Sequence, residues 1–130
     1  KFAERSNVVI MDINDNVSES IRKLAQALRE GDRVVIFPEG TRTKDGRISE
    51  FRHTFAILAK EMGVKVVPVA IRGAYEALKP GATFPKPGAE ICVSYLPPMS
   101  AGENESYEDF SRRVRERVEG EWEAMGDARR

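Results

Sequence analysis

Short apolar runs alternate with polar stretches along the chain, and this pattern predicts strands separated by helices. The runs at Val8–Met11 and Arg33–Phe37 are short and bounded by polar or turn-forming residues, as is typical of buried strands. Val64–Ile71 is almost continuously aliphatic, which indicates a strand covered on both faces of a parallel sheet. A fourth strand is predicted at Glu90–Leu96, where Pro97 and the proline after it end the run.

Three helices are predicted from apolar residues that recur on one helical face. The first follows Asn16, which has capping-box spacing to Glu19, and it ends at Gly31. The second spans about Thr54–Met62, and the third spans about 106–125 after a capping serine, Ser106. The last helix carries an apolar stripe at a spacing of four, which favours a docking surface over a cofactor site: Phe110, Val114, Val118 and Trp122.

The order of these elements predicts the fold class. Strands that alternate with helices make two successive βαβ units, whose crossovers should be right-handed. We therefore expect an α/β fold, a mostly parallel sheet of about four strands with flanking helices. A chain of 130 residues is long enough for one core, so residues 1–130 are expected to form a single domain or part of one. The proline-rich stretch Lys79–Gly88 is predicted to be a surface loop.

Composition narrows the function classes. Lys and Arg number 21 and Asp and Glu also number 21, so no net charge draws the chain towards nucleic acid. Cys92 is the single cysteine and lies in an apolar alternation, which indicates a small core residue and a reducing compartment. No apolar run approaches the roughly 20 residues of a membrane-spanning helix, so we expect these residues by themselves to be soluble.

Candidate chemistry follows the predicted strand Arg33–Phe37. Open α/β sheets bind their ligands at the carboxyl ends of strands, and a polar stretch begins there. Pro38 ends the strand, Gly40 lets backbone N–H groups approach an anion, and Arg42 offers a planar fork for phosphate oxygens. Thr41 adds a hydroxyl donor, while Glu39 either holds the arginine or accepts from a substrate hydroxyl. From the residues alone, a solvated turn with a surface Glu–Arg pair explains the pattern equally well.

The block Phe37-Pro38-Glu39-Gly40-Thr41-Arg42 resembles the Phe-Pro-Glu-Gly-Thr-Arg block of the lysophosphatidic acid and glycerol-phosphate acyltransferase family. Two further features agree with this family. Phe51-Arg52 resembles its Phe-Lys/Arg pair, and Val66-Val67-Pro68-Val69 resembles its later apolar-Pro-apolar block, thought to shape the acyl-donor side of the site. The resemblance implies that substrate binding falls on these residues: Phe37, Pro38, Glu39, Gly40, Thr41, Arg42, Arg52 and Pro68.

The chain departs from the family pattern at two positions. Thr54 stands where the pattern usually has glycine, which implies a helix that packs differently near the site. Ile13 stands where the family's Gly-x-x-Phe-Ile-x-Arg block has its arginine, in the segment Asn7–Ile13. Isoleucine cannot bind phosphate, so we expect an acceptor other than simple lysophosphatidic acid, such as a lysophospholipid with a larger head group.

The family's His-x-x-x-x-Asp block, which supplies the general base, is not found in this sequence. Its one histidine, His53, is followed five positions later by Leu58, so we expect His53 to be structural or solvated. No catalytic residue is therefore expected within residues 1–130. The catalytic pair is expected upstream of Lys1 in a larger polypeptide, and these residues alone are expected to be inactive.

The resemblance implies acyl transfer from acyl-CoA or an acyl-carrier protein to a lysophospholipid hydroxyl. The thioester is a substrate, and no metal or redox cofactor is expected. The implied partners are the lysophospholipid acceptor, the acyl thioester donor and a membrane contacted peripherally, without nucleic acid. The implied location is the cytoplasm, at the inner face of a membrane.

Two other classes remain open. Asp12-Ile13-Asn14-Asp15 resembles the Asp-x-Asp motif of magnesium-dependent phosphohydrolases, although its second aspartate comes one position late. A non-catalytic module is the other alternative, in which the basic loop binds anionic lipid head groups or a partner. Metal dependence would distinguish the first class, and lipid binding without acyl transfer would distinguish the second.

Overall fold

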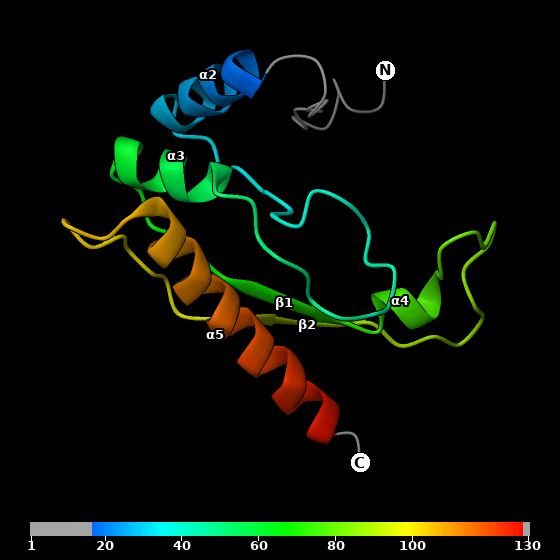
Figure 1. Cartoon of the computed structure of the whole chain (residues 1–130). Coiled ribbons are helices and arrows are strands. Elements are labelled where there is room, and N and C mark those ends of the chain that lie inside the picture. The colour runs from blue at the N-terminus through cyan, green and yellow to red at the C-terminus, as the bar shows by residue number, and fades with distance from the viewer. Residues whose placement is uncertain (1–16, 129–130) are drawn as a thin grey trace. The chain divides into compact units, whose positions relative to one another are not determined.

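The computed structural model describes residues 17–128 (Figure 1). The chain divides into two compact units, Lys1–Val35 and Ile36–Arg130. The predicted strand Val8–Met11, the segment Asn7–Ile13 and the Asp12–Asp15 motif all lie outside the described residues.

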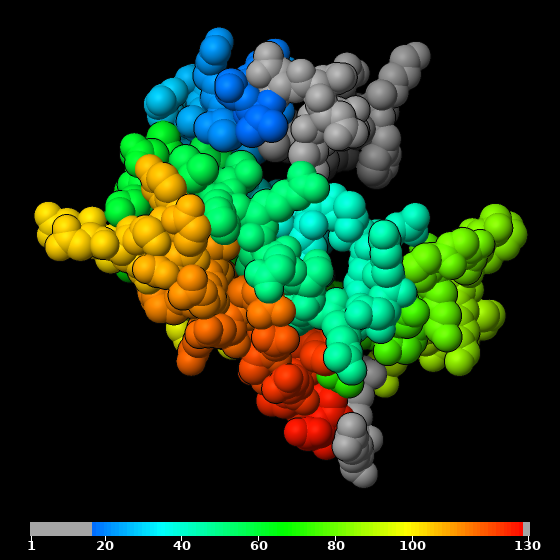
Figure 2. Space-filling view, viewed as in Figure 1, coloured from blue at the N-terminus to red at the C-terminus, as the bar shows by residue number. Residues whose placement is uncertain are grey.

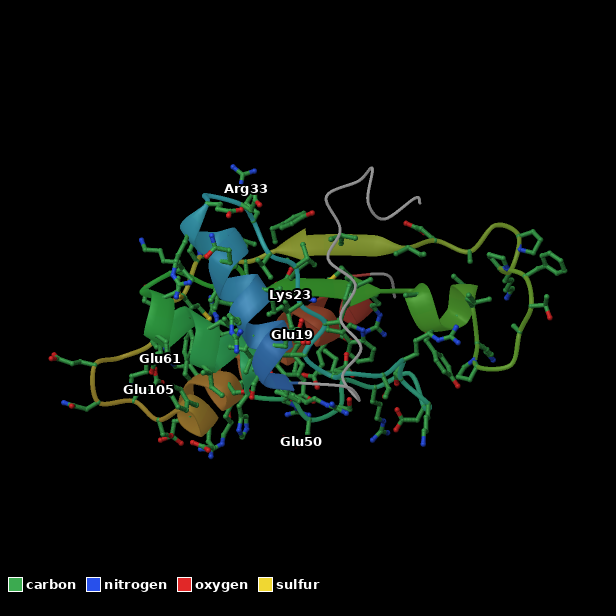
Figure 3. All side chains as sticks on the ribbon, turned by 90° about the horizontal axis from the view of Figure 1, so that it is seen from above. Glu19, Lys23, Arg33, Glu50, Glu61 and Glu105 are labelled. Carbon is green, nitrogen blue, oxygen red and sulfur yellow. The ribbon has the colours of Figure 1, made fainter. Side chains whose placement is uncertain are left out.

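The first unit contains the helix α2, Val17–Arg29, where the sequence predicts one. Leu24 and Ala25 are buried, while Glu19 and Lys23 form an exposed ion pair of 3.2 Å one helical turn apart, both labelled in Figure 3. Such a pair stabilises a helix by less than about 0.5 kcal/mol, so burial of the apolar face matters more. Gly31, with φ of 87°, follows the helix as predicted.

Two helices form the core of the second unit. They are α3, Thr54–Met62, and α5, Tyr107–Asp127, and both lie where the pattern predicts helices. Phe55 of α3 and Phe110 of α5 are buried with ring centroids 6.3 Å apart, and apolar neighbours pack around them. Gly63 closes α3 in the left-handed conformation, as its position in the sequence predicts.

The sheet of the second unit differs from the prediction. Its strands, β1 (Val69–Arg72) and β2 (Cys92–Tyr95), pair antiparallel, with Val69 opposite Tyr95. Within residues 17–128 these are the only strands, so a mostly parallel sheet of about four is not found there. A parallel pair needs a crossover of a dozen or more residues, usually helical, but residues 73–91 hold only the single-turn helix α4 (Ala74–Ala77) and a proline-rich loop. The chain therefore reverses direction between β1 and β2, and the two strands pair antiparallel.

The predicted strand Arg33–Phe37 has no regular secondary structure among the described residues, so this prediction is wrong there. A strand is defined by hydrogen bonds to a neighbour, and apolar sequence alone does not supply that neighbour. The predicted strand Val64–Ile71 is shorter than expected for the same reason. Its first half makes a single bridge, Val66 to Met99, before regular pairing begins at Val69.

Helix α5 covers one face of the sheet. Ser94 donates to Glu121 at 2.7 Å, and Arg72 donates to the Trp122 carbonyl at 2.7 Å with its guanidinium 4.1 Å from the Trp122 ring centroid. Phe110, Val114 and Val118 are buried. The apolar stripe of α5 therefore packs against the rest of the second unit, which confirms its prediction as a docking surface.

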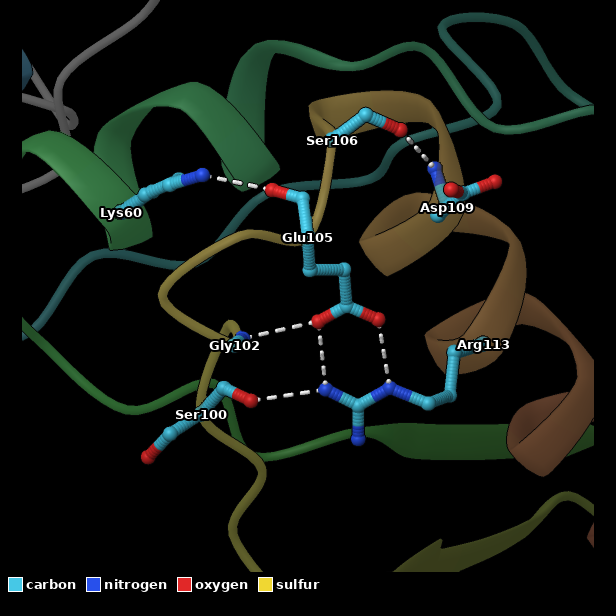
Figure 4. A network of polar contacts seen from close by, with 7 residues as sticks. All are labelled: Lys60, Ser100, Gly102, Glu105, Ser106, Asp109 and Arg113. Carbon is cyan, nitrogen blue, oxygen red and sulfur yellow. Dashed lines mark hydrogen bonds and ion pairs between the residues drawn. The ribbon is translucent and has the colours of Figure 1, made fainter.

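A polar network fixes the start of α5 (Figure 4). Ser106 accepts from the backbone N–H of Asp109 at 3.1 Å, which confirms the predicted cap. Beside it, Glu105 accepts two hydrogen bonds of 2.9 Å from Arg113 and one from the N–H of Gly102. The Arg113 hydrogen bond, followed by that of Gly102, lowers the pKa of Glu105 to about 2.

Within residues 17–128, every helix is too short or too polar to cross a lipid bilayer.

Candidate functional site

The block Phe37–Arg42 opens a long loop, residues 38–52, which we call the Gly40 loop. Its two ends are joined, because the N–H of Arg52 donates to the carbonyl of Pro38 at 2.8 Å. A turn follows at once, in which the N–H of Gly40 donates to the carbonyl of Phe37 at 3.1 Å. The loop lies on the surface of the second unit, coloured cyan to teal in Figure 2. The structure thus brings Pro38, Gly40 and Arg52, three predicted site residues, to one place.

Glu39 closes the loop from inside. One of its carboxylate oxygens accepts from both the N–H and the hydroxyl of Ser49, each at 2.8 Å. These bonds span ten residues and hold the two legs of the loop together. The structure shows that Glu39 braces the loop through Ser49, and its predicted role in substrate binding stays a prediction.

Gly40 occupies a position that no other residue fits well. Its φ is +74°, in the left-handed region, and a Cβ atom placed there would lie 2.5 Å from Nε of Arg52. The guanidinium of Arg52 therefore lies directly against the backbone of the turn. This close approach is what glycine permits, and it places a cation beside the turn.

Arg42 follows the turn and is exposed, as is Thr41. Its side chain makes no hydrogen bond or ion pair with any residue in the range 17–128. The structure does not show the alternative surface ion pair between Glu39 and Arg42, because Glu39 accepts its hydrogen bonds from Ser49. Arg42 is a cation presented to solvent on an internally braced loop.

The tip of the loop is also held. A turn lies at residues 44–46, where the N–H of Gly46, at φ of 81°, donates to the Thr43 hydroxyl at 3.0 Å. Asp45 accepts from the N–H of Arg47 at 3.0 Å, and this bond is the main cause that lowers the pKa of Asp45. The hydroxyl of Tyr75, which lies on α4, donates to the carbonyl of Lys44 at 3.3 Å.

Arg115 of α5 holds the Gly40 loop from a distant part of the sequence, and the sequence did not predict this contact. Arg115 donates through Nε to the carbonyl of Ser49 at 3.0 Å and through Nη2 to that of Ile48 at 3.1 Å. Its remaining nitrogen, Nη1, donates to Glu119 at 3.1 Å. The partners lie 66 and 67 residues apart in the sequence, so no local pattern could indicate this contact.

The other predicted site residues lie differently. Phe37 is 74% exposed at the start of the loop. Pro68 is buried just before β1, and its carbonyl accepts from the N–H of Leu96 at 2.9 Å. Pro68 therefore takes part in the antiparallel pairing of the sheet, and its predicted role in substrate binding stays a prediction.

His53 lies just before α3 with Nδ1 3.8 Å from a carboxylate oxygen of Glu108. Their side chains are 44% and 60% exposed, so the contact is weak. Both line an open pocket of about 220 Å³ together with Ser111, Arg112 and Arg115. Glu108 lies far from His53 in the sequence, so the five-residue spacing of the family's block does not indicate this contact.

Comparisons with known proteins identify the family to which the chain is similar. The family model described as Acyltransferase matches residues 1–72, which include the Gly40 loop. A 1-acyl-sn-glycerol-3-phosphate acyltransferase of Limnanthes douglasii is 34% identical over 89 residues, covering 65% of this chain and 31% of the relative. A lyso-ornithine lipid O-acyltransferase of Pseudomonas aeruginosa is 35% identical over 106 residues, covering 81% of this chain and 41% of that protein.

A solved structure shows the same fold. It is the 1-acyl-sn-glycerophosphate (LPA) acyltransferase PlsC from Thermotoga maritima, with a TM-score of 0.75 and 28% sequence identity. The match covers 82% of this chain and 44% of PlsC, so the chain spans less than half the length of each of these relatives. Since the family model covers more than half of the 130 residues and the braced glycine turn lies within the match, the chain belongs to the acyltransferase family.

Proposed function

We propose that this chain carries the anion-binding part of a glycerolipid O-acyltransferase. The observation that supports this most directly is Arg42, an exposed guanidinium without a partner in residues 17–128, on a loop braced at its ends and tip. Because the loop that carries Arg42 is braced before a ligand arrives, Arg42 loses less conformational freedom on binding than it would on a mobile loop, which favours affinity. Its planar fork matches two phosphate oxygens.

Arg52 would add a second positive charge to the same site, since its guanidinium lies against Gly40. In this proposal the turn positions the phosphate of the acceptor or of the thioester carrier, while Thr41 adds a hydroxyl donor. The residues proposed to bind substrate are those predicted from the sequence. Glu39, one of them, also braces the loop through its bonds to Ser49. Positioning of the reactants would then contribute much of the rate enhancement.

The general base is proposed to be a His-x-x-x-x-Asp pair upstream of Lys1. The histidine would take the proton of the acceptor hydroxyl as its oxygen attacks the thioester carbonyl, and the thiol of CoA or of the carrier protein would leave. Neither a metal nor a redox cofactor enters this scheme. The lengths of the relatives support a longer protein, because the chain covers 31% of the Limnanthes douglasii enzyme and 41% of the Pseudomonas aeruginosa enzyme.

The proposed acceptor is a lysolipid other than simple lysophosphatidic acid. Ile13 stands where the family's Gly-x-x-Phe-Ile-x-Arg block has its arginine, which argues against simple lysophosphatidic acid. The Pseudomonas aeruginosa relative is named for lyso-ornithine lipid, which supports a wider range of acceptors. The proposed location is the cytoplasmic face of a membrane, contacted peripherally.

The experiment is to compare acyl transfer by the full-length protein and by residues 1–130 alone. Each would receive a radiolabelled acyl-CoA and, in separate reactions, lysophosphatidic acid, a lysophospholipid with a larger head group, or lyso-ornithine lipid. The full-length protein should acylate a lysolipid without added magnesium, and residues 1–130 alone should not.

Each alternative gives a different outcome. Lipid binding by the full-length protein without acyl transfer would favour the non-catalytic module. Phosphate release that depends on magnesium would favour the phosphohydrolase. A clear preference for lysophosphatidic acid would leave the acyltransferase in place and reject the proposed acceptor class.

A further inference from the structure

Arg115 connects the C-terminal helix to the loop that carries the proposed anion site. Its side chain is 20% exposed, and it uses three nitrogens at once: two bind the carbonyls of Ile48 and Ser49, and the third binds Glu119. Glu119 lies one helical turn further along α5 and fixes the plane of the guanidinium. A cation whose donors point at two adjacent carbonyls and one carboxylate is arranged to hold a backbone segment.

The contact continues to the glycine turn through Ser49. The carbonyl of Ser49 accepts from Arg115, while its N–H and its hydroxyl donate to Glu39. Glu39 directly precedes Gly40. A continuous path of hydrogen bonds thus runs from α5 to the turn that presents Arg42.

Arg115 also lines the open pocket beside His53, but its guanidinium is engaged by protein groups and not directed at a ligand there. The pocket's other arginine, Arg112, is paired with Asp109 at 3.1 Å, and Arg115 is already paired with Glu119 and with the two carbonyls. These charges are therefore directed at protein groups, and the structure indicates a bracing role for Arg115 instead of a ligand-binding one.

We propose that Arg115, oriented by Glu119, is a positioning residue for acyl transfer that sets the far leg of the Gly40 loop and thereby the presentation of Arg42. This inference rests on the proposed function of Arg42. It extends that function to a helix outside residues 1–72, which the family model matches.

The test uses steady-state kinetics of the full-length protein, with acyl-CoA saturating and the lysolipid acceptor varied. Arg115→Gln keeps a polar side chain but removes the charged fork. Loss of charge-assisted hydrogen bonds of this kind should raise the acceptor KM by roughly tenfold and change kcat much less. Arg115→Lys keeps the charge but cannot bind both carbonyls and Glu119 in one plane. Its acceptor KM should therefore lie between that of the wild type and that of Arg115→Gln.

Arg113→Gln is the matched control. Arg113 lies on the same helix and also binds a carbonyl and a carboxylate, but its partners are Ser100 and Glu105 in a different loop (Figure 4). The Arg113→Gln substitution should lower the melting temperature of the protein without raising its acceptor KM. Equal KM increases in the Arg113 and Arg115 variants would show a general structural effect and overturn the proposal.

A double-mutant cycle with Arg42→Ala separates this inference from the proposed function. If Arg115 acts through Arg42, adding Arg115→Gln to the Arg42→Ala protein should change the acceptor KM less than about twofold further. Additive effects would overturn the positioning role alone. An unchanged acceptor KM in Arg42→Ala by itself would instead reject the proposed function.

Discussion

Gly40 and Gly88 share the same backbone φ of +74° but differ in their surroundings. A Cβ at Gly40 would meet the Arg52 side chain at 2.5 Å, whereas a Cβ at Gly88 would have nothing within 4 Å. Gly40→Ala should therefore lower the free energy of unfolding by about 1 to 3 kcal/mol, and Gly88→Ala by only about 1 kcal/mol. Urea denaturation of residues 1–130 would measure both.

The Arg52 side chain provides the check on this explanation. If contact with Arg52 causes the extra loss, Arg52→Ala should reduce the cost of Gly40→Ala to that of Gly88→Ala. An equal loss in the two single glycine variants would show that backbone strain alone decides the effect.

Glu105 should give the protein a pH-dependent stability at the acid end. Its pKa is lowered from 4.5 to about 2, chiefly by the Arg113 hydrogen bond, so the stabilisation is fully present above pH 4.5. It is lost as the pH falls from 4.5 towards 2, because protonation then becomes as favourable in the folded state as in the unfolded state. Since Arg113 is 44% exposed, the effect should be on the order of 1 kcal/mol.

The measurement is the free energy of unfolding of wild type and Glu105→Gln between pH 7 and pH 2.5. The difference between the two proteins should shrink over the lower part of this range. A difference independent of pH would contradict the assigned role of the carboxylate.

At the scale of elements, α5 holds the second unit together. Phe110 is fully buried against Phe55, and the far end of the helix is tied to β1 through Arg72. Phe110→Ala should cost about 3 to 5 kcal/mol of stability, while Arg117→Ala at an exposed position of the same helix should cost less than about 0.5 kcal/mol. Thermal denaturation would show this, and a similar small loss in both variants would contradict the packing described.

The helices could be predicted from sequence because their signals are local. Apolar periodicity, Gly63 after α3 and Ser106 before α5 each act within a few residues. Strand pairing depends on distant partners, so the sequence did not predict the antiparallel sense of β1 and β2, nor that Arg33–Phe37 pairs with no strand in the described part of the chain.

The same division applies to the candidate site. Arg42 and the turn at Gly40 could be identified from one contiguous block, but the bracing could not. Arg115 reaches the loop from a helix 66 residues further along the chain, and the bond from Glu39 to Ser49 crosses ten residues. The sequence therefore indicated which groups are candidates for ligand binding and did not indicate what holds them.

At the scale of the whole molecule, a chain with equal numbers of acidic and basic residues relies on local charge to bind an anion. Glu39 accepts hydrogen bonds from Ser49 and Asp45 accepts one within the loop tip, whereas Arg42 is exposed and has no partner among residues 17–128. The proposed site therefore depends on a separation of roles, in which Glu39 and Asp45 brace the Gly40 loop while Arg42, with Arg52 beside the turn, is proposed to meet the substrate.

Steady-state kinetics of Arg42→Ala and Arg42→Lys in the full-length protein test this claim most directly. With acyl-CoA saturating, Arg42→Ala should raise the acceptor KM about tenfold or more while kcat changes little, and Arg42→Lys should recover part of the loss. Acceptor kinetics in Arg42→Ala that match those of the wild type would contradict the account.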